Sequence, residues 1–448
     1  MTATHHQVRP ANAARPLALR YAAVRAQTEA LAAPLSEADC QAQSMPDASP
    51  TKWHLAHVTW FFETFVLEPH EARFKPHDTA YRVLFNSYYQ GVGAQHPRAQ
   101  RGLVTRPTLA QVRVYRAAVD ERIAALLAVP HAHEVDTLVA LGLQHEQQHQ
   151  ELILTDLLHL LSLNPTNPVY QPRWPLARVA PVAQAWVPFF ADTPGAVVDA
   201  GHRGPGFAFD NETPRHRQYL RPYALARRLT THGEWAAFVA DGGYTEPRWW
   251  LSAGWDWVRT QGIEAPLYWR RHGTATAPDW HCFTLHGLVP LDKHTPITHI
   301  SYFEADAFAR WWSVQHPGQP ATRLPTEFEW ELAAEQHEAV ALAAGNFLES
   351  GALHPLAVSG SGSAEPEGPL QLLGDVWEWT GSSYLPYPGF RAWDGAVFEY
   401  NAKFMINQMV LRGGSCATPR SHVRTSYRNF FPAEARWQFN GLRLARDV

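Results

Sequence analysis

The sequence predicts a two-domain protein in which a four-helix bundle precedes a mixed α+β domain. The chain has 448 residues, roughly three times the length of a usual domain. With 46% hydrophobic residues, 18 Trp and 21 Phe, it can fill a large core and does not resemble a disordered chain. Helical periodicity precedes a Pro-rich stretch at residues 165–188, and short apolar segments rich in Gly, Pro and Trp follow it. We place the two domains at residues 1–180 and 181–448.

Apolar residues at three- and four-residue spacing predict the helices of the first domain. The predicted helices span residues 18–33, 52–67, 108–128 and 134–162. The second helix follows Ser49-Pro50, and the last ends before Asn164-Pro165, because proline disfavours helix at the preceding residue. The connection at residues 69–107 is longer than a bundle requires, and long ordered loops are often functional.

The second domain has few long helical patterns, and its many short apolar segments indicate strands with much irregular structure. We predict two helices in it, Thr231–Ala240 and Tyr302–Gln315. Residues 351–368 include the run Ser-Gly-Ser-Gly-Ser and are predicted to form a flexible loop.

Charge and cysteine content exclude several classes of protein. The formal charge is -4, and the chain lacks the dense basic run that nucleic-acid binding requires, so we expect small-molecule substrates instead. The three cysteines, Cys40, Cys282 and Cys416, form no CxxC motif, which argues against a disulfide framework or a cysteine-based zinc site and favours the cytoplasm. No stretch approaches the roughly 18 apolar residues of a membrane span, and the first residues do not form a signal peptide.

The chain has 24 histidines, and the segment LQHEQQHQEL at residues 143–152 is the most informative place where they occur. His145 and His149 are four residues apart, so one helical face presents both and they can share a metal ion. A third ligand is expected from another helix, either His57 or His54. An incidental pair is one alternative. Another is a zinc-dependent hydrolase, because HEQQH matches the HExxH pattern with Glu146 as general base, although the extended metzincin pattern is absent.

With further motifs, these residues resemble a family, the iron-dependent sulfoxide synthases of ergothioneine biosynthesis, together with the sister selenoneine synthases. The resemblance covers nearly the whole chain and implies a DinB-like four-helix bundle followed by a C-type-lectin-like, formylglycine-generating-enzyme-like domain. The motifs that carry it are SPTKWHLAH (49–57), FNSYY (85–89), HEQQHQE (145–151), RLPTEFEW (323–330), GDVWEW (374–379), LRGGS (411–415) and GLR (441–443).

The resemblance implies that His57, His145 and His149 hold iron(II) on one face, with O2 as co-substrate. The acceptor is hercynine, the Nα-trimethyl form of histidine, whose imidazole C2 receives sulfur or selenium. Three neutral ligands leave about three open positions on the metal, enough for both substrates and O2, whereas a closed four-ligand site leaves none.

The resemblance also implies residues for binding hercynine. Gln148 would hydrogen-bond its imidazole ring. Its trimethylammonium group cannot donate a hydrogen bond and is best held by aromatic faces and polar oxygens. The segment that resembles this subsite consists of Trp437, Gln438, Phe439 and Asn440. The competing interpretation is that Gln148 is an ordinary polar helix residue and that the segment belongs to the core.

Tyr88 and Tyr89, on the long loop, resemble an active-site pair that donates a proton during the oxygen chemistry. Tyr400 is a weaker candidate for the same role. Arg98 and Arg101 resemble a basic pair that binds the donor's carboxylate, which suits the planar fork of arginine. Both pairs have ordinary alternatives, as packing aromatics and as solvated loop arginines.

The donor of the chalcogen stays open between sulfur and selenium. Relatives use cysteine or γ-glutamylcysteine, and the selenoneine synthases use a selenosugar. Ile406 stands where the proteobacterial sulfur enzymes usually carry Cys. Formylglycine-generating chemistry is disfavoured, because that activity needs two cysteines beyond the RGGS motif and this chain has only Cys416 there. A non-catalytic, lectin-like binding protein is a further alternative.

Overall fold

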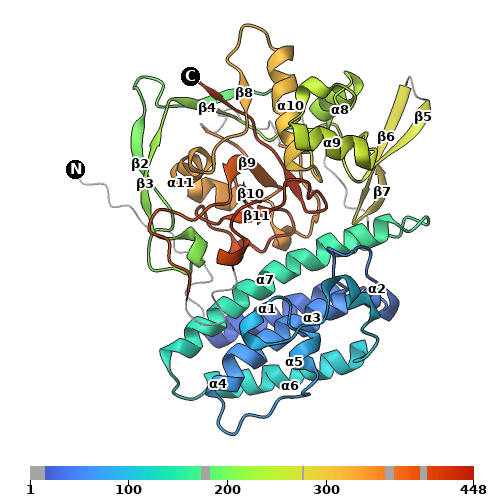
Figure 1. The fold of residues 1–448 in the computed structure, drawn as a ribbon, viewed down its shortest axis with the longest axis vertical. Coiled ribbons are helices and arrows are strands. Elements are labelled where there is room, and N and C mark those ends of the chain that lie inside the picture. The colour runs from blue at the N-terminus through green and yellow to red at the C-terminus, as the bar shows by residue number, and fades with distance from the viewer. Residues whose placement is uncertain (1–15, 173–181, 275–276, 359–367, 394–400) are drawn as a thin grey trace. The chain divides into compact units, whose positions relative to one another are not determined.

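The computed structural model describes residues 16–172, 182–274, 277–358, 368–393 and 401–448. The chain divides into two compact units. The bundle unit comprises Met1–Leu163 with Pro205–Phe207 and Trp393–Tyr400, and the sheet unit comprises Asn164–Gly204, Ala208–Ala392 and Asn401–Val448. The boundary predicted between residues 180 and 181 lies outside the described residues. A helical region followed by a sheet-containing region confirms the predicted fold class (Figure 1).

The bundle unit is built on four long helices, which occupy the four ranges that periodicity predicted. These are α1 (Leu17–Ala32), α3 (Thr51–Phe62), α6 (Leu109–Leu127) and α7 (His133–Ser162). The shorter elements are α2 (Glu37–Gln41), the π-helix η1 (Glu63–Leu67), α4 (Glu68–His70), α5 (Tyr81–Leu84) and the 3-10 helices η2 (Gln90–Val92) and η3 (Arg98–Leu103). None of the helices in the described ranges combines the length and apolar character needed to cross a membrane.

Helix α3 lies at the centre of this unit, and each of its residues from Thr51 to Phe62 is buried. A helix that is buried on all sides must be surrounded by other elements, and α3 packs against both α6 and α7. It continues directly into η1, a short π-helix. π-Helical turns occur frequently at functional sites.

The long connection after α3 is tied back onto the bundle. Lys52 of α3 donates from Nζ to the carbonyl oxygens of Val104 (2.8 Å) and Pro107 (2.9 Å). Thr108 then caps α6, accepting from the backbone N–H of Gln111 at 3.2 Å. The connection therefore has fixed ends, and its short helices are ordered against α3.

The sheet unit contains two four-stranded sheets, ordered β1-β4-β13-β8 and β11-β10-β9-β12, besides a β2-β3 pair and a β5-β6-β7 sheet. The strands are β1 (Trp186–Phe189), β2 (Ala196–Ala200), β3 (His216–Leu220), β4 (Tyr223–Ala226), β5 (Trp269–Thr274), β6 (Ala277–Thr284), β7 (Gly287–Pro290), β8 (Thr322–Arg323), β9 (Trp377–Ser383), β10 (Met409–Arg412), β11 (Asn429–Phe431), β12 (Asn440–Gly441) and β13 (Ala445–Asp447). Strands β12 and β9 are parallel, whereas the other strand pairs are antiparallel.

Both helices predicted in this unit are present, and the unit contains two further helices that were not predicted. The predicted helices are present as α8 (His232–Ala240) and α10 (Tyr302–Gln315), and α9 (Ser252–Gln261) and α11 (Glu327–Ala344) are additional. Helix α11 begins with a capping box, in which Thr326 accepts from the backbone of Glu329. That start signal, Thr followed by Glu three residues later, is readable in the sequence.

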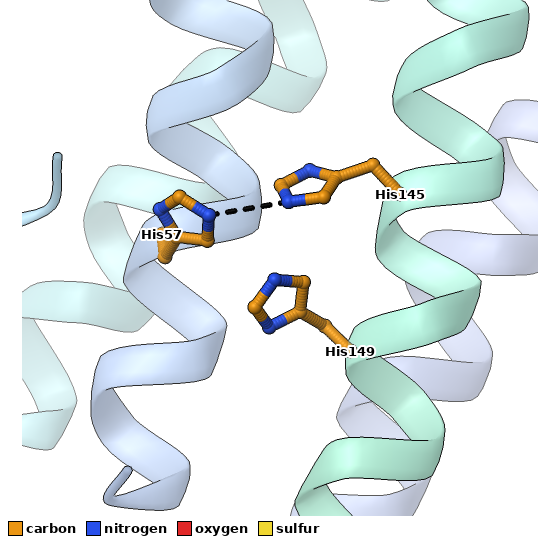
Figure 2. Close-up of side chains that lie close together, drawn as sticks. All are labelled: His57, His145 and His149. Carbon is orange, nitrogen blue, oxygen red and sulfur yellow. Dashed lines mark hydrogen bonds between the residues drawn. The ribbon is translucent and has the colours of Figure 1, made fainter. Parts of the chain in front are cut away.

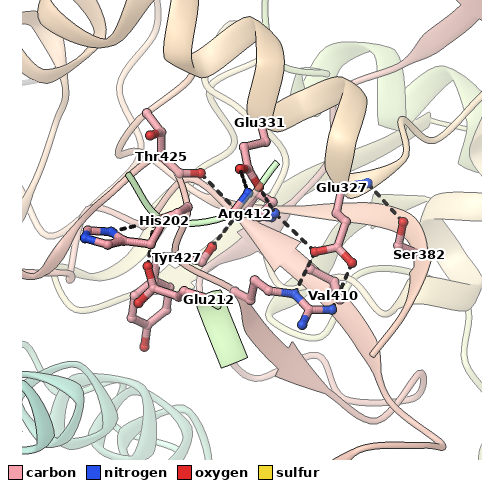
Figure 3. A network of polar contacts seen from close by, with 12 residues as sticks. His202, Glu212, Glu327, Glu331, Ser382, Val410, Arg412, Thr425 and Tyr427 are labelled. Atoms are coloured by element: carbon pink, nitrogen blue, oxygen red, sulfur yellow. Dashed lines mark hydrogen bonds and ion pairs between the residues drawn. The ribbon is translucent and has the colours of Figure 1, made fainter. Parts of the chain in front are cut away.

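A buried ionic network attaches α11 to the sheet behind it (Figure 3). Arg412 of β10 lies 3.1 Å from Glu327 and 2.5 Å from Glu331, and all three side chains are buried. Arg428 pairs with Glu327 at 2.8 Å, so two guanidinium groups balance two carboxylates. The motif residues Glu327 and Arg412 thus hold the fold together, and removing one partner would leave a buried charge uncompensated.

Candidate metal centre

Three histidines from two helices converge in the bundle unit. The ligand nitrogens of His57, His145 and His149 all lie within 4.8 Å of one another. One turn of α7 separates His145 from His149, and packing of α3 against α7 brings His57 to face them (Figure 2). Within the described ranges, no other group of three His, Cys, Asp or Glu residues is as close.

Hydrogen bonds decide which ring nitrogen of His57 is free for a metal. Its Nδ1–H donates to the carbonyl oxygen of Phe85 at 2.6 Å, which leaves the lone pair on Nε2. That Nε2 lies 3.2 Å from Nε2 of His145 (Figure 2). Two nitrogens bound at right angles to one ion, each about 2.1 Å from it, would be about 3 Å apart. The spacing fits two ligands of a single ion.

Burial keeps the three imidazoles neutral. The exposed fractions of His57, His145 and His149 are 0%, 2% and 8%. Burial lowers the pKa of His145 to about 3 and holds the pKa values of His57 and His149 well below their usual range. Neutral imidazole is the form that binds a metal ion. Three such ligands leave the full charge of a divalent ion in place and suit a metal of intermediate softness.

Aromatic rings enclose the histidines. Trp53 stacks on His57 with ring centroids 4.6 Å apart and an interplanar angle of 11°, and Trp60 stacks on His57 at 5.5 Å and 18°. Phe61 contacts His145 at 4.7 Å between centroids. These rings were not predicted to belong to the site, although the run of aromatics around His57 is visible in the sequence. Their contacts restrict rotation of the His57 and His145 rings.

Glu146 belongs to a different network from its neighbour His145. Its carboxylate accepts hydrogen bonds from Arg25 at 2.9 Å, Thr28 at 2.7 Å and Arg116 at 3.1 Å. Its exposed fraction is 0%. A general base must be within reach of a water or substrate proton, whereas this carboxylate is held by two arginines. The geometry therefore argues against a zinc hydrolase in which Glu146 of HEQQH is the general base.

The structure separates the two histidines of α3 that were open as the third ligand. His57 belongs to the three-histidine group, whereas His54 contacts Nδ1 of His149, which is a member of that group. Its Nδ1 lies 2.8 Å from Nδ1 of His149, and its Nε2 lies 3.1 Å from Oδ2 of Asp156. Spacing in the sequence gave no signal for Asp156.

The tyrosine pair lies beside these rings. Tyr89 is fully buried, and its ring centroid is 5.7 Å from that of Trp60 and 5.1 Å from that of Phe65. Tyr88 stacks on Tyr89 at 4.7 Å. Trp60 thus contacts both Tyr89 and His57. Tyr400 lies outside the described residues.

Arg98 and Arg101 do not converge on one point. Arg101 is buried, its guanidinium carbon lies 3.4 Å from the ring centroid of Trp53, and its Nη1 donates to Oγ of Ser49 at 2.9 Å. Burial lowers the pKa of Arg101 to about 9. Arg98 is exposed and donates to the carbonyl oxygen of Asp47. Both side chains would have to reorient before they could bind one carboxylate of the donor together.

The candidate residues for hercynine lie in both units. Gln148 is half-buried on α7, next to His149. In the sheet unit, Gln438, Phe439 and Asn440 are buried, and Trp437 is half-buried. Phe439 packs on His299, 4.9 Å between ring centroids, and Oδ1 of Asn440 accepts from the backbone N–H of Ile300 at 3.1 Å.

Comparisons with known proteins agree with this architecture. Residues 20–153 match the DinB superfamily, and residues 191–448 match the sulfatase-modifying factor enzyme 1-like domain. A protein of Mycolicibacterium thermoresistibile named hercynine oxygenase is 33% identical over 438 residues, which cover 92% of this chain and 90% of that protein. A protein of the same name from Mycobacterium tuberculosis is 32% identical over 459 residues, covering 96% of this chain and 99% of that protein.

A more distant relative points the same way. Ergothioneine biosynthesis protein 1 of Schizosaccharomyces pombe is 27% identical over 256 residues, which are 54% of this chain and 28% of that protein. The relatives named hercynine oxygenase span both units, so the similarity extends to the bundle that carries the three histidines. This chain belongs to the hercynine oxygenase family.

Proposed function

We propose that this protein is a mononuclear non-haem iron(II) oxygenase that uses O2 to join sulfur or selenium to C2 of the imidazole of hercynine, and that it works in the cytoplasm. The observation that carries the proposal is the buried group of three neutral histidines. The names of the relatives support hercynine as the acceptor. The product class is then that of ergothioneine or of its selenium counterpart.

The three histidines would hold the metal on one side and leave the other side to the substrates. Iron(II) bound there would supply electrons to O2 and open positions for donor and acceptor. Trp53 and Trp60 stack on His57, so they resist rotation of its ring. This fixed geometry lowers the entropic cost of bringing two substrates and O2 together.

For the acceptor, we assign Gln148 to the imidazole ring and the segment 437–440 to the trimethylammonium end. Gln148 is adjacent to His149 on α7, and an amide can both donate to and accept from an imidazole. The segment contributes two aromatic rings and two amide groups. Those groups suit a cation that cannot donate hydrogen bonds.

For the donor, two residues favour different answers. Arg101 is a buried cation, and it forms no ion pair with a carboxylate in the described part of the chain. A carboxylate-bearing thiol, such as cysteine or γ-glutamylcysteine, would supply that missing charge. Ile406, in place of the Cys of sulfur-using relatives, favours a selenosugar, which has no carboxylate. The side chain of Ile406 is 66% exposed.

We assign the proton donor to the tyrosine pair. Tyr89 stands one ring from the ligand His57, and Tyr88 stacks on its outer side. A phenol can donate a proton as charge develops on oxygen. Such a donor would direct the reaction toward bond formation at the imidazole carbon rather than oxidation of the thiol alone.

The first experiment is an aerobic assay of protein reconstituted with iron(II). Hercynine is supplied with cysteine, γ-glutamylcysteine or a 1-selenosugar in parallel, and products are identified by mass. We expect a hercynine adduct with at least one donor: a sulfur adduct assigns a sulfoxide synthase, and an adduct formed only from the selenosugar assigns a selenoneine synthase. If hercynine stays unchanged with every donor while iron is bound, the acceptor assignment is wrong.

Two controls separate the alternatives. The His57→Ala variant should lose both iron and activity, whereas a lectin-like binding protein would keep its ligand affinity. Protein loaded with zinc should be inactive, whereas a zinc hydrolase would be active in that form and would lose activity in the Glu146→Gln variant.

A further inference from the structure

A chain of buried hydrogen bonds leads away from the ligand His149. Nδ1 of His149 lies 2.8 Å from Nδ1 of His54, and Nε2 of His54 lies 3.1 Å from Oδ2 of Asp156. The same carboxylate oxygen accepts from the backbone N–H of Ser49 at 2.8 Å. The exposed fractions of His54 and Asp156 are 2% and 6%. The chain therefore runs through the interior, from α7 to α3 and back to α7.

With Asp156 ionised and His54 neutral, the end group sets the direction of every proton in this chain. An ionised carboxylate only accepts hydrogen bonds, so Nε2 of His54 carries a hydrogen and donates to Asp156. A neutral imidazole has one donor and one acceptor nitrogen, which makes Nδ1 of His54 an acceptor. Nδ1 of His149 must then carry the hydrogen between the two rings. The lone pair of His149 is left on Nε2, the other nitrogen of its ring.

We propose that His54 and Asp156 are positioning residues that set the tautomer and ring orientation of His149 and strengthen its Nε2 as a metal ligand. Ligating histidines commonly donate their second N–H to a carboxylate or carbonyl, and this raises the basicity of the ligand. Here the carboxylate acts through an intervening imidazole. The inference rests on the proposed metal centre but is independent of the identity of donor and acceptor.

The tautomer of His57 is set in a different way. The Nδ1–H of His57 donates to a neutral backbone carbonyl, that of Phe85, at 2.6 Å. A carbonyl fixes a tautomer without adding negative charge, whereas the chain behind His149 ends in a carboxylate. The two ligands are therefore unequal, with His149 the more basic donor to the ion.

The outer end of the chain is also anchored. Ser49 binds Asp156 through its backbone N–H and accepts from Nη1 of Arg101 through Oγ at 2.9 Å. Ser49 directly precedes Pro50, the N-cap of α3, and His54 lies in the first turns of that helix. The N-terminal end of α3 thus holds His54 and Asp156, and the same helix positions His57.

The test measures metal binding rather than turnover. Co(II) is titrated anaerobically into the full-length protein, and affinity and the visible absorption spectrum are recorded. His54→Phe keeps a ring but removes the acceptor, and we expect a loss of about 10- to 100-fold in affinity with a changed spectrum. Asp156→Asn keeps both hydrogen bonds through its carbonyl oxygen but removes the charge, and we expect a loss of about tenfold.

The matched control is His159→Phe, on the same helix. His159 hydrogen-bonds Oγ of Ser44 at 2.8 Å and interacts with Asp156 through charge alone, so its replacement should change Co(II) affinity far less than His54→Phe does. Thermal unfolding of each metal-free variant separates a loss of folding from a loss of ligand strength. Selective ¹⁵N labelling of histidine gives a second readout, because the hydrogen-bonded N–H of His149 should disappear or shift in His54→Phe.

Each remaining outcome has a defined meaning. Wild-type affinity and an unchanged spectrum in both His54→Phe and Asp156→Asn would overturn the inference and leave the metal centre standing. Complete loss of binding in His54→Phe, equal to that in His57→Ala, would make His54 a ligand and also overturn it. If the wild-type protein itself binds no Co(II), the proposed metal centre is wrong, and this inference is wrong with it. A negative hercynine assay on a protein that binds Co(II) bears only on the proposed reaction.

Discussion

His145 and Glu146 are adjacent in the chain, yet one helical step sends their side chains into separate networks. His145 faces the other two histidines of the metal centre. Glu146 closes a buried ionic cluster with Arg25 and Arg116, at 2.9 and 3.1 Å. Burial alone would raise the pKa of Glu146, but the two guanidinium groups outweigh it and hold that pKa below its usual range. The residue is therefore a structural anion beside the three-histidine group.

At this scale we predict the effect of Glu146→Gln. The change removes the fully buried carboxylate that Arg25 and Arg116 share and leaves them only Asp120 and Glu29, which are more exposed, at 2.7 Å each. Removing one partner of a buried ion pair costs about 3–5 kcal/mol of the free energy of unfolding, and we expect a loss near the lower end of that range. Urea unfolding should show the loss, while Co(II) affinity of the folded protein stays near that of the wild type. The control is Glu29→Gln, whose half-exposed carboxylate also pairs with Arg116, at 2.7 Å; it should cost about 1 kcal/mol or less. A fully stable Glu146→Gln protein that no longer binds metal would contradict this role.

At the scale of elements, the metal centre depends on how closely α3 approaches α7. Gly142 of α7 stands one turn before His145, and a Cβ built there would lie 2.4 Å from Cε1 of Phe62 on α3. Phe62 is fully buried, with Tyr21 packed edge-on against it at 5.0 Å. Its ring therefore has no room to move. The missing side chain at Gly142 sets the separation of the two helices that carry the ligands.

We predict that Gly142→Ala destabilises the protein although alanine is the better helix former. The propensity gain is about 1 kcal/mol, and forcing a methyl group into a packed core costs about 1–3 kcal/mol. Pushing α7 away from α3 should also weaken Co(II) binding, because His57 is on α3 and His145 is on α7. A second change, Phe62→Leu, should restore part of the affinity.

The measurements for this pair are urea unfolding and anaerobic Co(II) titration. Thr137→Ala, at an exposed position of α7, is the control and should change neither. If Gly142→Ala binds Co(II) as tightly as the wild type, the contact with Phe62 does not set the helix separation.

At the scale of the whole molecule, the described chain buries many histidines in both units, and this links stability to pH. In the sheet unit, burial lowers the pKa values of His232 and His299 to about 3 and that of His354 to about 4. An unfolded chain takes up these protons near the usual pKa of about 6.5. Between those values the unfolded state binds more protons than the folded state, so the free energy of unfolding falls as the pH is lowered.

We predict that the protein loses stability from about pH 6.5 down to pH 4, by roughly 1.4 kcal/mol per pH unit for each buried neutral histidine. Urea unfolding over this range measures the slope. His232→Phe removes one such group and should make the slope shallower, because phenylalanine takes up no proton in the unfolded state. His294→Gln, at an exposed position of the same unit, should leave the slope unchanged. An identical slope in His232→Phe would contradict this account.

The sequence by itself determined the features that depend on local periodicity and on motifs. Apolar spacing located α1, α3, α6 and α7, and a spacing of four residues placed His145 and His149 on one face. Motif content across both halves identified the family. Helix α9 was missed because Gly, Pro and Trp are frequent around it. Helix α11 was missed although its sequence is rich in Ala and Glu and the Thr326 capping signal was present.

Only the tertiary structure decided which residues meet. By position in the helix alone, His54 and His57 are equally plausible as ligands, although the family resemblance implied His57. Packing of α3 on α7 places His57 in the histidine group and His54 against Nδ1 of His149. Arg98 and Arg101 look like a pair but separate into a surface and a buried residue. Asp156 had no local signal at all. The physical reason is that spacing along a helix defines a face, whereas the partner of that face is set by long-range packing of buried side chains.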